Sequence, residues 1–485
     1  MKAGFYDTDI TPAMGAQVPG SYSKRFASGV RDALKARAAV FADEQNTVAM
    51  IGLDTCAISA RTGKLIREAA ERKTAGKIKA GSITIAASHT HSGGSLLGFH
   101  PDEMEDASPL IKKLALECSI SVDPEYERLV VERASDAVFL ALNNMNAVTF
   151  SVGSGQEGTV SFCRRMRMKN GRTFTHPGRG NPDIAGPAGP IDPEVGVIGG
   201  WRENNTLAGC IVNFACHGTA WQQTVISADW IAAMEQTIRA VYGRDVVVVF
   251  LNGACGDIGT VNNIDLRQGR SPEEKLNIVG TRVGAEAVKV LASSEKGDLS
   301  PIRSISQKIN INFRNLSPVK VKQSLEAAER LAGDESSWES DEFIWAKERL
   351  LFDYVRKHNK TREVEIQAVQ IGPAVFLTSP AEYFCALGQK IKRAVRKRFP
   401  FVYVVELAND LIGYVPGEEA FGSTGGGYET RMTAYSNLEP KAGEIIADAC
   451  IALAGKLHPG KVPVGPRIET PGTPWPYGNQ LPEID

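Results

Sequence analysis

The chain has 485 residues, 43% of them hydrophobic, and its 55 basic residues nearly balance 56 acidic ones. This length and composition allow a substantial apolar core. The formal net charge of −1 provides no overall field to attract nucleic acid or an anionic membrane. Neither a run of eighteen apolar residues nor an apolar N-terminal region is present, so we expect no membrane span and no export signal. A small molecule is the expected partner, and homo-oligomerisation stays open.

The eight cysteines are scattered along the chain without a CxxC pair, and several lie inside apolar segments. Buried free thiols are therefore expected rather than disulfides. Free thiols fit a reducing compartment, so we predict a cytoplasmic protein.

Strand-like and helix-like segments alternate along the first 300 residues, which predicts an α/β fold of mixed sheets with surrounding helices. The clearest buried strands are predicted at residues 48–53, 82–87, 209–215 and 246–251. The clearest helices are predicted at residues 62–73, 125–144, 230–242 and 272–291.

After about residue 301 the pattern changes to a strand at 304–312, charged helices at 319–331 and 343–358, and strands at 363–371 and 374–378. We predict one catalytic domain over residues 1–457 and leave open a smaller C-terminal α/β subdomain that begins near residue 300. Residues 458–485 are Pro-rich and are predicted to form an extended tail. The Gly- and Pro-rich stretch 177–193 is predicted to be an ordered loop or lid over the site.

A His-x-His pair stands in the run Ser88-His89-Thr90-His91-Ser92-Gly93-Gly94, directly after a predicted strand. Side chains two residues apart on a strand face the same side, so this spacing is a compact way to hold a catalytic metal. His217 follows a second apolar strand in the same manner. On its own it is typical of a structural or capping histidine, and the pair at 89 and 91 makes it a candidate ligand.

Three further segments follow predicted strands. Glu382 opens a helix after the strand 374–378, a place where a carboxylate is also expected for charge complementarity with the helix N-terminus. Residues 251–259 are rich in small residues, which suits either a ligand-binding loop or a tight turn. The Gly-rich stretch 422–428 lacks the Lys and Ser/Thr of a phosphate-binding loop, so we interpret it as a flexible loop.

Seven short motifs occur in a fixed order along most of the chain. They are Asp9-Ile10-Thr11-Pro12, Ser88-His89-Thr90-His91-Ser92-Gly93, Phe214-Ala215-Cys216-His217-Gly218-Thr219, Asn252-Gly253-Ala254-Cys255-Gly256-Asp257, Pro380-Ala381-Glu382, the segment 409–414, and Tyr428-Glu429. Together they resemble the neutral, non-lysosomal ceramidases, which are zinc-dependent amidases that split N-acyl sphingosine. The SHTHSG and HGT strings carry most of this resemblance.

The resemblance implies a site, residue by residue. The family's zinc ligands correspond to His89, His217, Glu382 and Tyr414. His91 then lies beside the metal as a polarising or proton-transferring group, with Asp257 as a second proton carrier. The active-site arginine corresponds to Arg164, and the tyrosine that contacts the reacting carbonyl corresponds to Tyr428. A catalytic zinc keeps one position for a water molecule, whose pKa it lowers to about 7.

The chain departs from the family pattern in two ways. Gly259 takes the place of a serine often proposed as the nucleophile, so substrate meets a glycine there, and the adjacent hydroxyl of Thr260 is out of register by one residue. We therefore expect zinc-bound hydroxide to attack directly. The second departure is that we find neither the export signal nor the immunoglobulin-like domain of typical ceramidases, which makes ceramide itself a doubtful substrate.

The sequence thus predicts a zinc-dependent hydrolase that cleaves an amide bond of a small molecule. An esterase or lactonase that uses the same site is the nearest alternative. A non-catalytic homologue that binds a metal or ligand is a further one.

Overall fold

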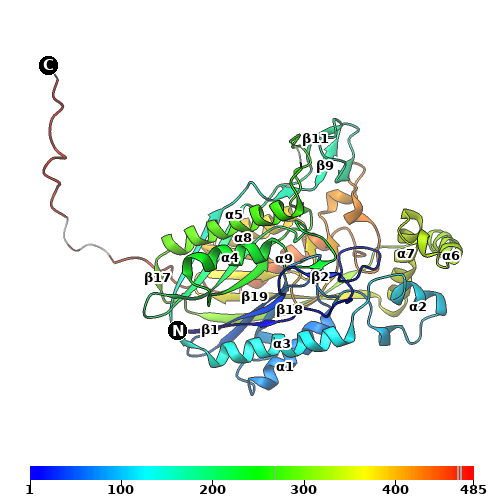
Figure 1. The fold of residues 1–485 in the computed structure, drawn as a ribbon, viewed down its shortest axis with the longest axis horizontal. Coiled ribbons are helices and arrows are strands. Elements are labelled where there is room, and N and C mark those ends of the chain that lie inside the picture. Colours follow the sequence, from blue (N-terminus) through cyan, green and yellow to red (C-terminus); the bar gives the residue numbers. More distant parts are fainter. Residues whose placement is uncertain (268, 467–468, 470–471, 485) are drawn as a thin grey trace.

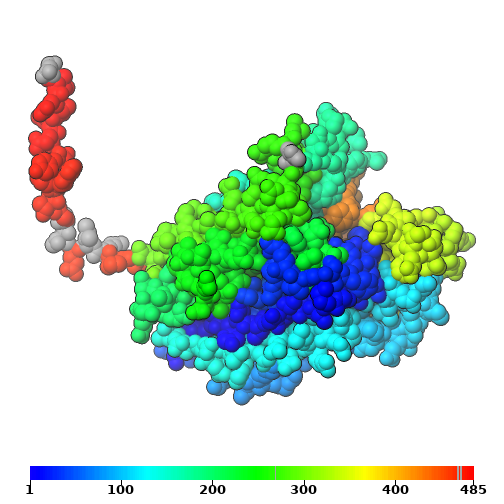
Figure 2. All heavy atoms as spheres, viewed as in Figure 1, coloured from blue at the N-terminus to red at the C-terminus, as the bar shows by residue number. Residues whose placement is uncertain are grey.

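The computed structural model describes residues 1–485 except 268, 467–468, 470–471 and 485. Three mixed sheets, each covered by helices on its outer face, meet in one central core (Figure 1). The predicted mixed α/β fold is therefore confirmed. Figure 2 shows the elements packed into one body, from which the red C-terminal segment extends away.

The first sheet has the strand order β5-β4-β3-β1-β6. Its strands are β1 (Lys2–Asp9), β3 (Lys35–Ala42), β4 (Thr47–Leu53), β5 (Ile83–Ala87) and β6 (Asn146–Ala147). Helices α1 (Ala60–Lys73) and α3 (Pro124–Asn143) pack on its outer face. Helix α1 begins two residues before its predicted start at 62, and α3 begins one residue before its predicted start at 125. The side chains of Ser59 and Asp123 accept hydrogen bonds from backbone N–H groups in the first turns of these helices and so fix the starts. Strands β4 and β5 run parallel.

The second sheet has the order β15-β13-β12-β7-β17. Its strands are β7 (Thr149–Gln156), β12 (Glu194–Trp201), β13 (Leu207–Phe214), β15 (Val247–Asn252) and β17 (Lys296–Gly297). Helices α4 (Trp230–Tyr242) and α5 (Pro272–Ser293) cover its outer face. Strands β13 and β15 run parallel.

The third sheet has the order β18-β19-β20-β22 and is built entirely from residues after 300. Its strands are β18 (Ile302–Asn312), β19 (Thr361–Ile371), β20 (Ala374–Thr378) and β22 (Phe401–Val405). Helices α8 (Cys385–Val395) and α9 (Ala442–Ala454) cover its outer face. Strands β20 and β22 run parallel. Inner-face residues of all three sheets, among them Phe41, Phe150 and Phe376, share one buried cluster.

The remaining elements surround this core. Helices α2 (Pro109–Leu116), α6 (Pro318–Leu331) and α7 (Asp341–His358) pack on one another at the right of Figure 1. Two-residue strands form the pairs β2 (Gly29–Val30) with β14 (Val225–Ile226), β8 (Phe162–Cys163) with β16 (Ile258–Gly259), and β21 (Glu382–Tyr383) with β23 (Tyr414–Val415). Single turns of 3₁₀-helix are η1 (Ala80–Ser82), η2 (Pro101–Met104), η3 (Glu335–Ser337), η4 (Glu418–Phe421) and η5 (Tyr428–Thr430).

The stretch 177–193 differs from the predicted loop in one respect. It contains a strand, β11 (Ile184–Pro187), which pairs with β9 (Arg165–Met168) in a small sheet completed by β10 (Thr173–Thr175). This sheet projects from the body at the top of Figure 1. The Gly- and Pro-rich composition of residues 177–193 did not predict the strand β11, because pairing with β9 holds this strand and it has no apolar pattern of its own.

Two expectations about the whole chain can be compared with the structure. All eight cysteines lie in the described part of the chain and are buried free thiols, as predicted. Among the residues that the structure describes, no helix is both long and apolar enough to cross a bilayer.

The contact between the first two sheets is close enough to depend on a glycine. A Cβ atom added to Gly52 of β4 would lie 2.5 Å from the backbone oxygen of Phe250 in β15. We therefore expect Gly52→Ala to force the sheets apart and to lower the free energy of unfolding by about 2 kcal/mol. Denaturant titration measures this change in the free energy of unfolding. Gly81→Ala is the matched control, because a Cβ there meets no atom within 4 Å, and a loss of equal size in both variants would contradict the account.

Candidate metal centre

The parallel strand pairs of the three sheets converge at one place. His89 follows β5, His217 follows β13 and Glu382 follows β20, so each sheet supplies one of these side chains just beyond the carboxyl end of a strand. Loops at this end of parallel strands are the usual position of ligand sites. The backbone of His89 has φ 66°, a left-handed conformation that is rare outside glycine and that turns the chain sharply as the strand ends.

The three side chains form a compact buried cluster. Nε2 of His89 lies 3.2 Å from Oε2 of Glu382, and Nε2 of His217 lies 3.4 Å from the same oxygen. One ligand atom from each of the three residues lies within 4.8 Å of the others. These side chains are almost inaccessible to solvent, at 3%, 0% and 8% exposure for His89, His217 and Glu382.

The chemistry of this cluster fits a metal ion. Oε2 of Glu382 is buried and has no hydrogen-bond partner among the described residues, although a buried carboxylate oxygen is costly to leave unpaired. Two ligands about 2.1 Å from one tetrahedral zinc ion lie about 3.4 Å apart, which matches the separations of Oε2 from the two imidazoles. Two imidazole nitrogens and a carboxylate are a typical ligand set for catalytic zinc.

The protonation of the cluster follows from its burial and its internal charges. Burial alone raises the pKa of Glu382, but His89 and His217 outweigh it and hold that pKa well below its ordinary value. Burial and then Arg164 lower the pKa of His217 to about 3, so this imidazole is neutral. For His89, Cys56 and Glu382 outweigh burial and raise the pKa. A metal ion would therefore compete with a proton on His89.

The neighbouring parallel strands orient the two imidazoles from behind. Nδ1 of His89 donates to the backbone oxygen of Cys56 after β4, at 2.8 Å. Nδ1 of His217 lies 3.3 Å from Sγ of Cys255 after β15. That thiol in turn donates to the buried carboxylate of Glu406 after β22, at 2.8 Å. Burial raises the pKa of Glu406 to about 7. Contacts of this kind fix which imidazole nitrogen faces a metal.

The contact between Cys255 and His217 gives a prediction for metal affinity. We expect Cys255→Ala to weaken zinc binding about tenfold, because His217 loses the group that orients its ring. Cys255→Ser keeps a hydrogen-bonding atom at that place and should bind zinc more tightly than the alanine variant. Competition with a chromogenic chelator measures both constants. Equal zinc affinity in the alanine variant and the wild type would contradict the orienting role.

His91 lies beside the cluster but is not part of it. Its Nε2 lies 3.4 Å from Nε2 of His89. His91 belongs to a second, alternative group of possible ligands with Cys56 and His89, which lacks His217 and Glu382. Nδ1 of His91 is buried and has no hydrogen-bond partner among the described residues. Burial, followed by His89 and His217, holds the pKa of His91 well below its ordinary value, so the ring is neutral. A neutral imidazole at this place can accept a proton.

Tyr414 reaches the cluster through strand pairing. In the parallel pair β21 and β23 it is the register partner of Glu382, so the two side chains emerge beside each other. Its hydroxyl lies 3.1 Å from the hydroxyl of Tyr428. The guanidinium of Arg164 lies over both tyrosine rings, 5.3 Å and 5.1 Å from their centres. These three side chains form the wall next to the cluster.

The guanidinium of Arg164 makes three further contacts. Nε donates to the buried carboxylate of Glu429 at 3.0 Å, and Nη2 donates to the backbone oxygen of Gly256 at 2.8 Å. Nη1 donates to Nε2 of His217 at 3.0 Å. A positive charge is thereby fixed within reach of the cluster.

A cavity of about 380 Å³, the inner cavity, opens onto these groups. Its lining includes His89, His91, Arg164, Glu382, Tyr414 and Tyr428. It also includes Tyr22, His176 and Tyr435, which the sequence analysis did not assign to the site. Tyr22 and Tyr435 lie in no recognisable motif, and the only signal for His176 was its position at the start of the Gly- and Pro-rich stretch.

Comparison with solved structures identifies the architecture. A structure described as ceramidase complexed with C2 matches with a TM-score of 0.67 and 19% identity, over 96% of this chain and 77% of that one. Neutral ceramidase from Pseudomonas aeruginosa matches with a TM-score of 0.67 and 21% identity, over 96% of this chain and 76% of that one. The fold is that of the neutral ceramidases. No protein-family model matches the sequence, and no curated protein matches it.

Two predicted residues, Asp257 and Gly259, lie apart from the inner cavity in this ceramidase fold, and so does Thr260, which was not assigned to the site. Asp257 is not among the lining residues, and its carboxylate accepts a hydrogen bond from the backbone N–H of Cys385 at 2.8 Å. Gly259 and Thr260 are not lining residues either. A Cβ at Gly259 would meet no atom within 4 Å, and Oγ1 of Thr260 is buried without a hydrogen-bond partner among the described residues. The structure therefore places no hydroxyl of this segment at the cluster.

Proposed function

We propose that the protein is a zinc-dependent hydrolase that cleaves an amide bond of a small molecule. The observation that carries this proposal is the buried triad of His89, His217 and Glu382 beside a cavity. Within the triad, Oε2 of Glu382 faces the two imidazoles and has no hydrogen-bond partner among the described residues. The likeness of the fold to proteins described as ceramidases supports the amide as the bond that is cleaved.

His89, His217, Glu382 and Tyr414 would hold the zinc ion, which when bound polarises a carbonyl group and lowers the pKa of a water molecule. Nε2 of His217 has one lone pair, so a metal at that nitrogen would release Nη1 of Arg164 from it. The freed N–H would then be available to a substrate oxygen. Glu429 and the backbone of Gly256 keep the guanidinium in place.

Arg164 and Tyr428 are suited to stabilise the oxyanion that forms when water adds to the carbonyl. Burial raises the pKa of Tyr428, so its hydroxyl keeps the proton that it must donate. A donor fixed in this way contributes roughly 3 kcal/mol to transition-state stabilisation. His91, neutral and next to His89, would take the proton that the attacking water loses and return it to the leaving amine.

The test is a metal analysis coupled to a substrate panel. We expect purified protein to contain one zinc ion per chain, to release acyl groups from small amides, to lose that activity on chelation and to regain it with zinc. Matched amide, ester and lactone substrates distinguish an amidase from an esterase or lactonase. Stoichiometric zinc without turnover of any acyl compound would instead indicate a non-catalytic binding protein.

A further inference from the structure

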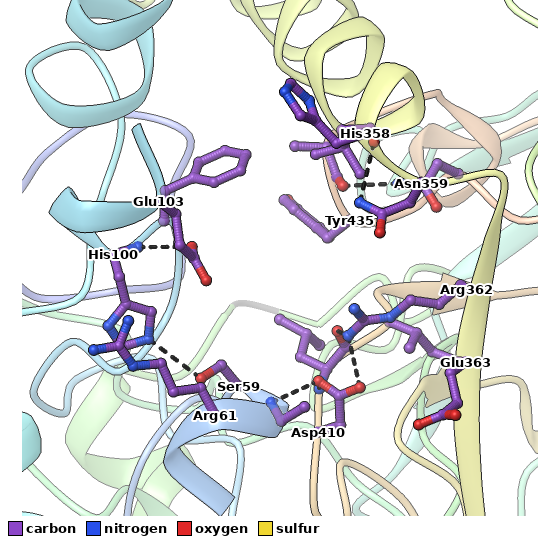
Figure 3. Close-up of a pocket in the computed structure, with 18 of the residues that line it drawn as sticks. Ser59, Arg61, His100, Glu103, His358, Asn359, Arg362, Glu363, Asp410 and Tyr435 are labelled. Carbon is purple, nitrogen blue, oxygen red and sulfur yellow. Dashed lines mark hydrogen bonds and ion pairs between the residues drawn. The ribbon is translucent and has the colours of Figure 1, made fainter. Parts of the chain in front are cut away.

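A second and larger cavity, the outer chamber, adjoins the inner cavity. It has a volume of about 660 Å³ and shares three lining residues, Leu97, Leu411 and Tyr435, with the inner cavity. Helix α1 begins at this chamber, and the end of α7 and the start of β19 form the opposite side (Figure 3). The two cavities therefore meet at these three side chains.

The deep wall of the outer chamber offers mainly apolar contact. Leu96, Met104 and Ile412 line it and are buried. Asp410, the carboxylate on the floor, is already engaged: its two oxygens accept from the backbone N–H of Ala60 at 2.8 Å and from Arg362 at 2.6 Å. An aliphatic chain can pass along this wall without leaving a polar group unpaired.

The mouth of the chamber carries two opposite charges with spare hydrogen-bonding atoms. Glu103 and Arg362 lie on opposite sides of the chamber in Figure 3. Oε2 of Glu103 accepts from the backbone N–H of His100 at 3.0 Å, and Oε1 has no partner among the described residues. Arg362 uses only Nη2, toward Asp410 and the backbone oxygen of Leu411, so Nε and Nη1 are free of partners within the described chain.

The other charged groups at the mouth are paired with each other or with groups outside it. Arg61 forms an ion pair with Asp102 at 2.7 Å, and Glu363 forms one with Lys308 at 2.6 Å. Glu103 is thus left as an acceptor for a cation, and Arg362 as a donor to an anion. A ligand that carries both a cation and an anion makes the strongest hydrogen bonds to these two groups.

We propose that the outer chamber binds a zwitterionic, amino-acid-like head of the substrate, a conclusion that rests on the proposed amidase function. The ammonium group contacts Glu103, the carboxylate contacts Arg362, and an aliphatic linker passes Leu97, Leu411 and Tyr435 to the scissile amide in the inner cavity. Arg362 is already paired with Asp410 through Nη2, so an uncharged amide leaves only Oε1 of Glu103 and Nε and Nη1 of Arg362 without a ligand group. Hydrogen bonds to charged groups are the strong ones, which gives the zwitterion its advantage.

The reaction on such a substrate is an ordinary hydrolysis. Water adds to the amide carbon, the carbon–nitrogen bond breaks, the acyl group leaves as a carboxylic acid and the nitrogen takes a proton. The released product is a diamino acid whose side-chain amine was acylated.

The test uses the zinc-loaded full chain and a matched set of acetamides, with acetate release as the readout. The set comprises Nε-acetyllysine, the analogue without its amino group, the analogue without its carboxylate, the analogue without either, and the shorter homologue Nδ-acetylornithine. A short-chain ceramide serves as the lipid comparison. We expect kcat/KM for at least one zwitterion to exceed that of the uncharged acetamide and of the ceramide by about 100-fold, and each single-charge analogue to fall between.

Two variants assign the charges to residues. Glu103→Gln keeps an acceptor for the backbone of His100 while it removes the negative charge, so we expect about a tenfold loss that is confined to ammonium-bearing substrates. Arg362→Lys keeps a charge beside Asp410 but loses the planar fork, and about the same loss is expected only for carboxylate-bearing substrates. Glu335→Gln, an exposed glutamate on η3, is the control and should change no ratio.

The outcomes are distinguishable. Equal losses for all substrates in either variant would show damage to the fold rather than recognition of charge, and would overturn the assignment. If the wild type cleaves the uncharged acetamide or the ceramide with the same kcat/KM as the zwitterions, the inference fails while the amidase proposal stands. If no amide is cleaved by zinc-loaded protein, the proposed function fails and the inference fails with it.

Discussion

Replacing Glu382 with Gln is expected to abolish both zinc binding and hydrolysis. The substitution keeps the shape of the side chain but removes the negative charge that faces Nε2 of His89 and of His217 at 3.2 Å and 3.4 Å. Zinc content should fall from one ion per chain to a small fraction. The value of kcat/KM should fall at least about 1,000-fold, which corresponds to about 4 kcal/mol. Metal analysis and a kinetic assay on the same preparation measure the two effects.

A matched control separates loss of the metal from loss of the fold. Glu326→Gln changes an exposed glutamate on α6 and should retain wild-type zinc content and activity. Circular dichroism should show that both variants are folded. A Glu382→Gln protein that keeps stoichiometric zinc and full activity would show that the metal lies elsewhere or takes no part in the reaction.

Replacing Tyr428 with Phe is expected to slow hydrolysis about 100-fold while zinc content stays unchanged. The hydroxyl of Tyr428 lies 3.1 Å from that of Tyr414, beside the guanidinium of Arg164, and is one of the donors assigned to the oxyanion. The loss should appear mainly in kcat, because the hydrogen bond from the Tyr428 hydroxyl to the substrate's carbonyl oxygen strengthens as negative charge develops on that oxygen. Steady-state kinetics on one amide substrate give both constants.

The control for this variant is Tyr242→Phe. The hydroxyl of Tyr242 donates to the backbone oxygen of Val288, away from the cavity, at 3.4 Å. We expect Tyr242→Phe to leave kcat unchanged. A Tyr428→Phe enzyme that loses affinity for substrate at constant kcat would assign this residue to binding rather than to transition-state stabilisation.

Local sequence patterns predicted the main elements of the fold because those patterns are short-range. The predicted strand at residues 48–53 is β4 (Thr47–Leu53), and the predicted helix at 230–242 is α4 (Trp230–Tyr242). Two-residue strands such as β21 and β23 were not predicted, because they are held by pairing between distant segments rather than by an apolar run. The strand β11 within 177–193 escaped prediction for the same reason.

The candidate site was predictable in part. His89, His217 and Glu382 each follow an apolar strand, and that local signal marked them as candidates. Their convergence depends on how three sheets pack against one another, which no single segment encodes. The resemblance of the motifs to those of the ceramidases indicated that these three residues act together. That they bind zinc remains a prediction.

Other parts of the site had no sequence signal. Tyr22 and Tyr435 reach the inner cavity through tertiary packing alone. Asp257 stands in one of the seven motifs, yet its carboxylate accepts a hydrogen bond from the backbone of Cys385 and it does not line the cavity. The outer chamber is formed by several segments far apart in the chain, so its charges could be recognised only in the folded protein.

The proposed function depends on one zinc ion bound between His89, His217 and Glu382. Crystals grown with zinc and measured on both sides of the zinc absorption edge test it directly. We expect a single strong anomalous peak within bonding distance of Nε2 of both histidines and of Oε2 of Glu382. A peak at the alternative group formed by Cys56, His89 and His91, or no peak at either group, would contradict it.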